Sequence, residues 1–301
     1  MIRVKNLWPE FAEFWTAAWG KPEDEMGQLW RALYEEEHHE VFSVYFSPPH
    51  FGRREHLSMA LSRYAGEFER IAAAAERAQN SVPSLVEAVL TAFDAREDEL
   101  ELEVICFVGV YGTDGFCLPA PDRARAFFAL ECLAGYTPAR ADALMAHELS
   151  HGVHMELNRK ANPGGFDWDL ATLDEFFPWI AGALFREGLA VAASRRAVPG
   201  LAEHEYLFYS PDQWEWCCEN AAELATKLLG KLDRRDWDTF TEFFAGDPQR
   251  KWPPYPRTGY YIGGLAIEHL LGTATLRELA ELELRTISRL IRRSLETIRE
   301  G

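Results

Sequence analysis

The pattern of apolar and polar residues along this chain predicts a mostly helical protein with a small sheet. Apolar residues recur at helical spacing near residues 8–19, 54–79, 83–96, 122–134, 138–157, 173–194, 212–231, 236–245, 260–272 and 275–300. The clearest strand signal is the apolar, β-branched run from Leu102 to Tyr111, and a second short strand is expected at Phe116–Leu118. We therefore expect an α+β fold, predominantly helical, in which a small twisted sheet lies beside the helix at residues 138–157.

The helix expected from Pro138 to about Leu157 carries the main chemical signal. Thr137 suits the N-cap, and Pro138 suits the first helical position. Within this helix stands His147-Glu148-Leu149-Ser150-His151, which has the pattern HExxH. Residues four apart lie on one face of a helix, so both imidazoles can bind one metal ion, and Glu148 can reach a water on it. Zinc suits such a site because it binds neutral imidazole and, in catalytic sites, keeps one position open for water.

A third ligand is needed, and Glu187 is the candidate. It lies in the expected helix at residues 173–194, where most residues are apolar. A carboxylate in such surroundings is costly unless it is paired or coordinated, and neighbouring Arg186 points to a different face. Gly188 keeps the adjacent surface small, so a second helix can approach closely. The alternative interpretation places Glu187 on an exposed polar stripe.

His154 continues the helix face that carries His147 and His151. Three ligands from one straight helix are disfavoured, since seven residues span about 10 Å of helix axis. We therefore expect His154 to lie in the cleft or beside the ligands, with direct ligation as the alternative.

Together these segments resemble a known class of enzymes. HELSH on one helix and the EGLA-type segment Glu187-Gly188-Leu189-Ala190 on a later helix are similar to the gluzincin zinc metallopeptidases. Downstream, Gly259-Tyr260-Tyr261-Ile262-Gly263 is similar to the GYxxG segment of small bacterial predicted Zn-dependent proteases. The resemblance covers roughly residues 100–272 and leaves the N-terminal third unmatched.

Two features separate the chain from other zinc peptidases. The extended metzincin motif is absent, because its glycine would fall at His154 and its third histidine at Leu157. Thermolysin-like enzymes place an aspartate four residues after the ligand glutamate to support a histidine, and that position here is Val191. The resemblance is therefore to the wider gluzincin class.

The resemblance implies a zinc ion held by His147, His151 and Glu187. Glu148 would then be the general base of amide hydrolysis. Tyr260 would stabilise the negative charge that develops on the substrate oxygen, with Tyr261 as its alternative. Either tyrosine could instead simply pack at the start of a helix.

Two further segments have open roles. Arg257 either orients a substrate carboxylate or is solvated. Phe116–Leu118 lies just before the metal helix, where zincins bind a peptide backbone as an added strand. An ordinary packing strand is the alternative for this segment.

Composition bounds the organisation of the chain. With 301 residues and 48% hydrophobic content it can form one large or two closely packed domains. We expect an N-terminal helical region at residues 1–99 and a zincin-like catalytic region with C-terminal helices at residues 100–301, packed as one unit. The five cysteines are an odd number and two of them are adjacent, so a disulfide framework is not expected.

Charge and hydropathy restrict the classes of partner that we expect for this chain. The net charge of −17 argues against a nucleic acid or an anionic membrane and favours cationic or neutral substrates. Residues Met1–Lys5 lack the apolar core of a signal peptide, and no uncharged apolar run is long enough to span a bilayer. These features indicate a cytoplasmic protein, and they indicate no oligomeric state.

The sequence thus predicts a zinc-dependent hydrolase, with Zn²⁺ as cofactor and a peptide or small amide as substrate. A peptidase is the first interpretation, and a zinc hydrolase of a non-peptide amide is the second. A non-catalytic helical protein with structural or no metal is a third. Structural zinc favours closed sites rich in cysteine, and no cysteine lies near the ligand segments.

Overall fold

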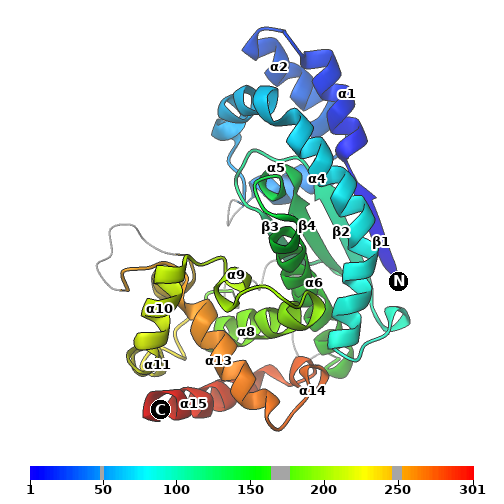
Figure 1. Cartoon of the computed structure of the whole chain (residues 1–301). Coiled ribbons are helices and arrows are strands. Elements are labelled where there is room, and N and C mark those ends of the chain that lie inside the picture. The colour runs from blue at the N-terminus through cyan, green and yellow to red at the C-terminus, as the bar shows by residue number, and fades with distance from the viewer. Residues whose placement is uncertain (48–50, 164–176, 246–252) are drawn as a thin grey trace.

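A four-stranded sheet lies at mid-height in the molecule in Figure 1, with helices above, beside and below it. The computed structural model describes residues 1–47, 51–163, 177–245 and 253–301. The strands are β1 (Ile2–Asn6), β2 (Leu102–Phe107), β3 (Gly115–Pro119) and β4 (Ala124–Ala129). Their order is β1-β2-β4-β3, with β1, β2 and β4 parallel and β3 antiparallel to β4. This mixed sheet among many helices confirms the predicted α+β, predominantly helical fold.

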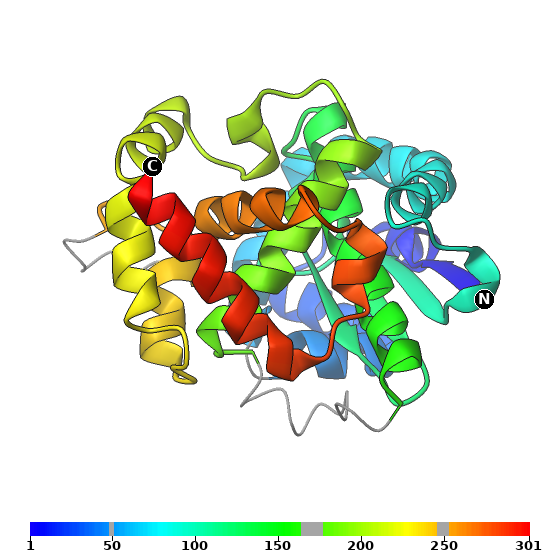
Figure 2. The ribbon, with the colours of Figure 1, turned by 90° about the horizontal axis from the view of Figure 1, so that it is seen from below.

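The helices surround the sheet unequally. α1, α2 and the long α4 lie at its upper end and along its side, while α8, α13 and α15 lie below it (Figures 1 and 2). α6 packs against β2, β3 and β4, so the helix with the HExxH segment lies beside the sheet as expected. The α-helices among the described residues are α1 (Trp8–Ala18), α2 (Glu23–Trp30), α3 (His39–Phe46), α4 (Leu57–Ala92), α5 (Leu130–Leu133), α6 (Pro138–Ala161), α8 (Ile180–Ala197), α9 (Glu203–Tyr206), α10 (Pro211–Glu219), α11 (Ala221–Leu229), α12 (Trp237–Phe240), α13 (Thr258–Leu271), α14 (Leu276–Ala280) and α15 (Leu284–Glu300).

Several elements differ from the prediction, and three of the differences concern the sheet and the long helix beside it. The helix expected at residues 122–134 is mostly the strand β4, because pairing with β2 and β3 on both sides outweighs the helical preference of its alanines. The first residues form β1, which adds a strand from the N-terminal region to the sheet. The two helices expected at residues 54–79 and 83–96 are one helix, α4, whose buried face continues from Val82 to Leu85 across Pro83.

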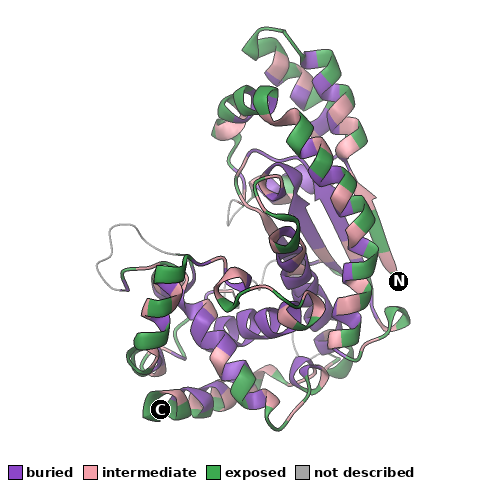
Figure 3. Cartoon of the chain, in the orientation of Figure 1, coloured by how far each residue is buried: buried purple, intermediate pink, exposed green. Residues whose placement is uncertain are grey.

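Burial follows this arrangement. β2 and β4 are buried along almost their whole length, and most of α6 and nearly all of α8 are buried as well (Figure 3). α8 is therefore a central helix of the core and not the amphipathic surface helix that its charged residues would suggest. No helix in the described ranges is long and apolar enough to cross a membrane. The five cysteines are all free thiols.

The segment between β2 and β3 has few backbone partners and is held by side chains. The hydroxyl of Tyr34 accepts a hydrogen bond from N–H of Val108 at 2.8 Å. The hydroxyl of Tyr45 accepts from N–H of Val110 at 3.0 Å and from N–H of Gly112 at 3.2 Å. These buried tyrosines come from the N-terminal region, so that region fixes the path of the chain toward Thr113, Asp114 and Gly115. The domain boundary at residue 100 stays a prediction.

A buried carboxyl completes this support. The two oxygens of Glu131 accept hydrogen bonds from N–H of Gly109 and of Tyr111, at 2.8 and 3.0 Å. Its side chain is 2% exposed. Burial raises the pKa of Glu131 to about 7, although the two backbone hydrogen bonds act in the opposite direction.

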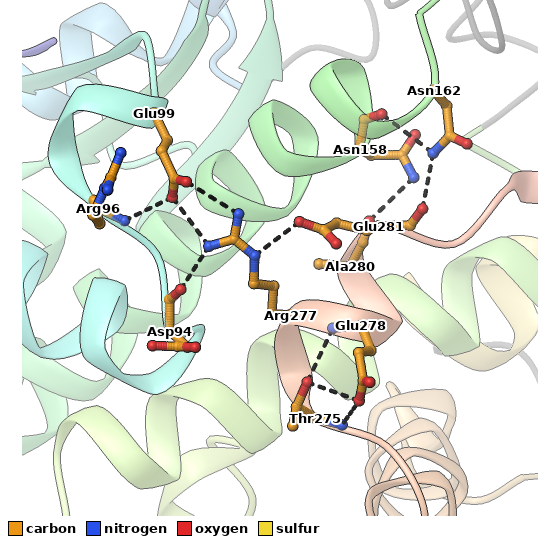
Figure 4. A network of polar contacts seen from close by, with 10 residues as sticks. All are labelled: Asp94, Arg96, Glu99, Asn158, Asn162, Thr275, Arg277, Glu278, Ala280 and Glu281. Atoms are coloured by element: carbon orange, nitrogen blue, oxygen red, sulfur yellow. Dashed lines mark hydrogen bonds and ion pairs between the residues drawn. The ribbon is translucent and has the colours of Figure 1, made fainter.

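A second polar network anchors the other end of α6 (Figure 4). Arg277 of α14 donates two hydrogen bonds to the carboxylate of Glu99, at 3.0 and 3.2 Å, and holds the pKa of that carboxyl down at about 2. Asn158 of α6 donates to the carbonyl oxygens of Ala280 and Leu282 at 3.1 and 2.7 Å. α14 therefore joins the carboxyl end of α6 to the connection between α4 and β2.

We predict that Glu131 makes the protein less stable as the pH rises from about 5 to 7.5. Its pKa is about 7 in the folded chain against an ordinary value of 4.5, so the folded chain holds a proton that the unfolded chain has released. That stabilisation, roughly 3 kcal/mol in full, is lost as the pH rises through 7. Urea unfolding of the wild type and of Glu131→Gln across this range isolates the effect, since the other titrating groups are shared. An equal slope in the two proteins would contradict the assignment.

Candidate metal centre

The three side chains expected to bind zinc converge in the structure. His147 and His151 come from α6, and Glu187 comes from α8. Oε2 of Glu187 lies 3.3 Å from Nε2 of His147 and 3.4 Å from Nε2 of His151. All three side chains are buried, and their ligand atoms lie within 4.8 Å of one another. They form a group that could hold a metal ion.

The two separations between Oε2 of Glu187 and the imidazole nitrogens fit a small tetrahedral cation. Zinc binds imidazole nitrogen and carboxylate oxygen at about 2.0–2.2 Å, so two ligands of one tetrahedron lie about 3.3–3.6 Å apart. The distances of 3.3 and 3.4 Å from Glu187 to the two histidines match that separation. Two imidazoles with one carboxylate are also a known ligand set of catalytic zinc, which keeps its fourth position for water.

Glu187 reaches the histidines because α8 packs closely against both α6 and α13 (Figure 2). A Cβ on Gly188 would lie 2.2 Å from the carbonyl oxygen of Gly263. A Cβ on Gly263 would lie 2.5 Å from the carbonyl oxygen of Leu184. The backbones of α8 and α13 therefore touch at a pair of glycines, one from the EGLA segment and one from the GYxxG segment.

Glu148 lies beside the ligands. It follows His147 on α6, and its side chain packs near Gly115 of β3, where an added Cβ would lie 3.2 Å from Cγ of Glu148. Burial raises the pKa of Glu148 to about 7, and the nearby Glu187 adds to the increase.

The two tyrosines at the start of α13 point in different directions. The ring of Tyr260 lies 6.1 Å from the ring of His147, measured between centroids. Tyr261 is 7% exposed and packs edge-on against Trp214 at 5.2 Å. Tyr260 therefore lies at the metal-binding group, and Tyr261 lies in the core. Burial raises the pKa of Tyr260, so its hydroxyl keeps its proton at neutral pH.

His154 is buried on α6 but does not belong to the ligand group. Its ring packs against Phe185 at 5.7 Å, and burial lowers its pKa to about 3, so the ring is neutral. Nδ1 of His147 is also buried and has no hydrogen-bond partner among the described residues. Val191 stands where thermolysin-like enzymes place an aspartate that supports a histidine, which agrees with this missing partner.

Two cavities flank the metal-binding group. The first, here the Arg257 cavity, has a volume of about 190 Å³, and the side chains that line it include Asp114, His147, Tyr206, Phe208 and Arg257. The second, here the Phe116 cavity, has a volume of about 340 Å³, and the side chains that line it include Phe51, Phe116, His151, Met155 and Glu187. Glu148 and Tyr260 line both cavities, so the cavities meet at the two side chains expected to be catalytic.

The strand β3 lies next to the metal-binding group. It is at the edge of the sheet and packs against α6. Phe116 and Cys117 of β3 line the Phe116 cavity, and the ring of Phe116 stacks on Phe51 at 3.9 Å and on Phe127 at 4.4 Å. The expected strand Phe116–Leu118 is therefore present at the site, and its pairing with a substrate stays a prediction.

Sequence reasoning missed several residues of the site. Asp114 follows the strand β2 in a turn, and its carboxylate accepts a hydrogen bond from the hydroxyl of Tyr136. Tyr206 and Phe208 reach the Arg257 cavity from the loop around α9, far from the metal ligands in sequence. The predicted turn at residues 112–115, directly before the edge strand β3, was a usable signal for Asp114. No local pattern marks the other two.

Comparison of the chain with models of protein families, with curated proteins and with solved structures finds no match. The resemblance to the gluzincins therefore stays a prediction from the HExxH, EGLA and GYxxG segments.

We predict that Gly188→Ala lowers stability by about 1–3 kcal/mol and weakens metal binding, because its new methyl group meets a backbone oxygen of α13. Gly264→Ala is the matched control, since its Cβ would lie an ordinary 3.6 Å from Val191. Both changes gain the same helix propensity, so the difference between them reports packing. Urea unfolding and zinc titration measure the two effects. Equal results for the two variants would refute close packing as the cause.

We predict one tightly bound metal ion per chain, which is lost after chelation. His147→Ala is expected to weaken metal binding at least about 100-fold, because loss of a ligand lowers metal affinity more than loss of the groups that support a ligand. His39→Ala is the control, since that side chain is 83% exposed. Mass spectrometry of untagged protein gives the metal and its stoichiometry. Thermal unfolding before and after chelation shows the coupling to stability. A variant His147→Ala with full metal content would exclude this site.

Proposed function

We propose that this protein is a zinc-dependent hydrolase that cleaves amide bonds, with peptides as its substrates. The observation that carries the proposal is the convergence of His147, His151 and Glu187 where two cavities meet. This ligand set contains no cysteine and leaves a position open, which favours a catalytic over a structural zinc. When bound, zinc would supply a Lewis acid that lowers the pKa of a water and polarises the substrate carbonyl.

Glu148 acts as the general base in this proposal. Its carboxylate accepts a proton from the attacking water and passes the proton to the leaving nitrogen as the C–N bond breaks. Its position supports the role, because it follows the ligand His147 on α6 and lines both cavities. A substrate that extends from one cavity into the other therefore passes Glu148.

Tyr260 acts as a hydrogen-bond donor. Its O–H donates to the substrate oxygen as negative charge develops there, and such donors contribute most when they are held in place before the reaction. Tyr260 is held by α13, with its ring beside His147 at 6.1 Å and the guanidinium of Arg257 at 4.4 Å from the ring centroid. Tyr261, which packs against Trp214, is no longer a candidate for this role.

The edge strand supports peptides as the substrates. Among the described residues β3 pairs with β4 alone, which leaves its other edge for an extended substrate chain in this proposal. Such pairing would place a peptide backbone along the Phe116 cavity, beside Glu148. A small amide without an extended backbone would not use this edge.

We predict that Glu148→Gln retains zinc but lowers kcat by several powers of ten, because the amide keeps the shape of the carboxylate and cannot accept a proton. The assay uses a peptide that the wild type cleaves, found by screening a library of unstructured peptides. Zinc content is measured on the same samples. Full zinc with near wild-type cleavage would overturn the mechanism.

Two variants calibrate this result. Glu156→Gln changes a second buried carboxylate on α6, about two turns further on, and is expected to leave kcat unchanged. Tyr260→Phe removes only a hydroxyl and is expected to lower kcat by about 10²–10³ with zinc retained.

A further inference from the structure

Arg257 is a charged residue of the Arg257 cavity, and it forms no ion pair with any described residue. Its guanidinium carbon lies 4.4 Å from the ring centroid of Tyr260, and its side chain is half-buried. Within residues 1–47, 51–163, 177–245 and 253–301, no carboxylate lies within 4.0 Å of its nitrogens. Asp114 lines the same cavity, and its carboxylate accepts a hydrogen bond from Tyr136. Arg257 therefore lines a cleft and is not the freely solvated side chain that was one of its two expected roles.

The chain around Arg257 is held in an unusual conformation. Arg257 has a φ of 62°, in the left-handed region that residues other than glycine seldom adopt. The hydroxyl of Tyr209 donates to the carbonyl oxygen of Arg257, and Nε2 of Gln213 donates to the carbonyl oxygen of Pro256 at 2.7 Å. Side chains from another part of the chain therefore impose this conformation. Backbone held in this way is typical of functional sites.

Arg257 brings a positive charge to a cavity that Asp114 and Glu148 also line. Arg257 precedes α13, whose N-terminal end adds a partial positive charge at the same place. Burial would lower the pKa of Arg257, but Tyr260, Tyr209 and Glu187 outweigh it, so the guanidinium is always charged. A guanidinium presents paired N–H groups that match a carboxylate.

We propose that Arg257 binds the free carboxylate at the end of a peptide substrate, so that the enzyme removes the C-terminal residue. This inference rests on the proposed hydrolase function. The Arg257 cavity, at about 190 Å³, lies below the usual 300–1,000 Å³ of ligand pockets, which suits one terminal residue better than a continuing chain. The larger, apolar Phe116 cavity then receives the preceding residue, with an apolar side chain near Phe116 and Met155.

The reaction balances as a hydrolysis. Water adds its oxygen to the carbonyl carbon, the C–N bond breaks, and Glu148 carries the proton of the water to the leaving nitrogen. The products are a shortened peptide and a free amino acid, whose carboxylate stays on Arg257 until release.

Binding without turnover tests the inference directly. The probes are N-acetyl-phenylalanyl-glycine and its C-terminal amide, titrated calorimetrically into zinc-loaded Glu148→Gln protein. We expect the acid to bind about 10- to 100-fold more tightly than the amide, as for a charge-assisted hydrogen bond, and Arg257→Gln in the same background to abolish that preference. Equal binding of the two probes, or a preference that survives Arg257→Gln, would overturn the inference.

Two further variants separate the possible causes. Arg140→Gln is the matched control, since its guanidinium also lies over an aromatic ring, 5.4 Å from the centroid of Phe208, and it does not line the cavity. It is expected to keep the preference. Arg257→Gly tolerates the left-handed backbone, so it preserves the loop if Arg257→Gln unfolds it. It is expected to lose the preference with unchanged thermal stability.

Turnover distinguishes substrate binding from the positioning of Tyr260. If Arg257 binds the carboxylate, Arg257→Gln raises KM for the acid and leaves kcat/KM for the amide nearly unchanged. An equal fall in kcat for acid and amide would mean that Arg257 only positions Tyr260, and the inference would fail. Cleavage of acid and amide at equal rates by the wild type would keep the hydrolase and reject the carboxylate site. If the protein binds the acid more tightly through Arg257 but cleaves neither probe, the carboxylate site is kept and the hydrolase function is rejected.

Discussion

The site depends on the direct contact between the backbones of α8 and α13. Gly188 and Gly263 let these helices approach until backbone atoms touch, and Glu187 is the residue next to that contact. Its Oε2 must lie 3.3 to 3.4 Å from two nitrogens of another helix, and metal sites tolerate only about 0.2 Å of error in their ligand distances. Burial alone would raise the pKa of Glu187, but the two histidines hold it well below its usual value. A bound metal would therefore link α6 to α8 at a position that the helix packing has already set.

The N-terminal third of the chain contributes to the site without supplying a ligand. The resemblance to zinc peptidases begins near residue 100, yet Tyr34 and Tyr45 hold the backbone at residues 108–112 through buried hydrogen bonds. That segment leads directly to Thr113, Asp114 and Gly115, which line the Arg257 cavity. The unmatched region thus supports the wall of the cleft, because buried backbone groups that lack a sheet partner must find side-chain partners.

Local signals in the sequence were enough for the metal-binding group and for the fold class. Thr137, Pro138 and the HExxH spacing define α6, and an isolated carboxylate in an apolar stretch identifies Glu187. β4 could not be recognised, since its alanines favour helix and only pairing on both sides makes it a strand. Tyr260 and Tyr261 are neighbours with the same side chain, so their different positions follow only from what packs around α13. The conformation of Arg257 depends on Tyr209 and Gln213, which lie more than forty residues away in sequence.

The charge of the chain as a whole and the charge of the cleft act at different distances. With 48 acidic and 31 basic residues, the surface repels anions, which affects the rate at which a carboxylate substrate arrives. At physiological salt, charges more than about 8 Å apart across water are largely screened, whereas a half-buried guanidinium acts on its ligand at contact distance. Arg257 is distinctive in a chain with so many carboxylates, because it lies in a cleft and forms no ion pair with any described carboxylate. The overall charge therefore acts on approaching molecules at long range, whereas the proposed binding of a carboxylate by Arg257 would act only at contact distance.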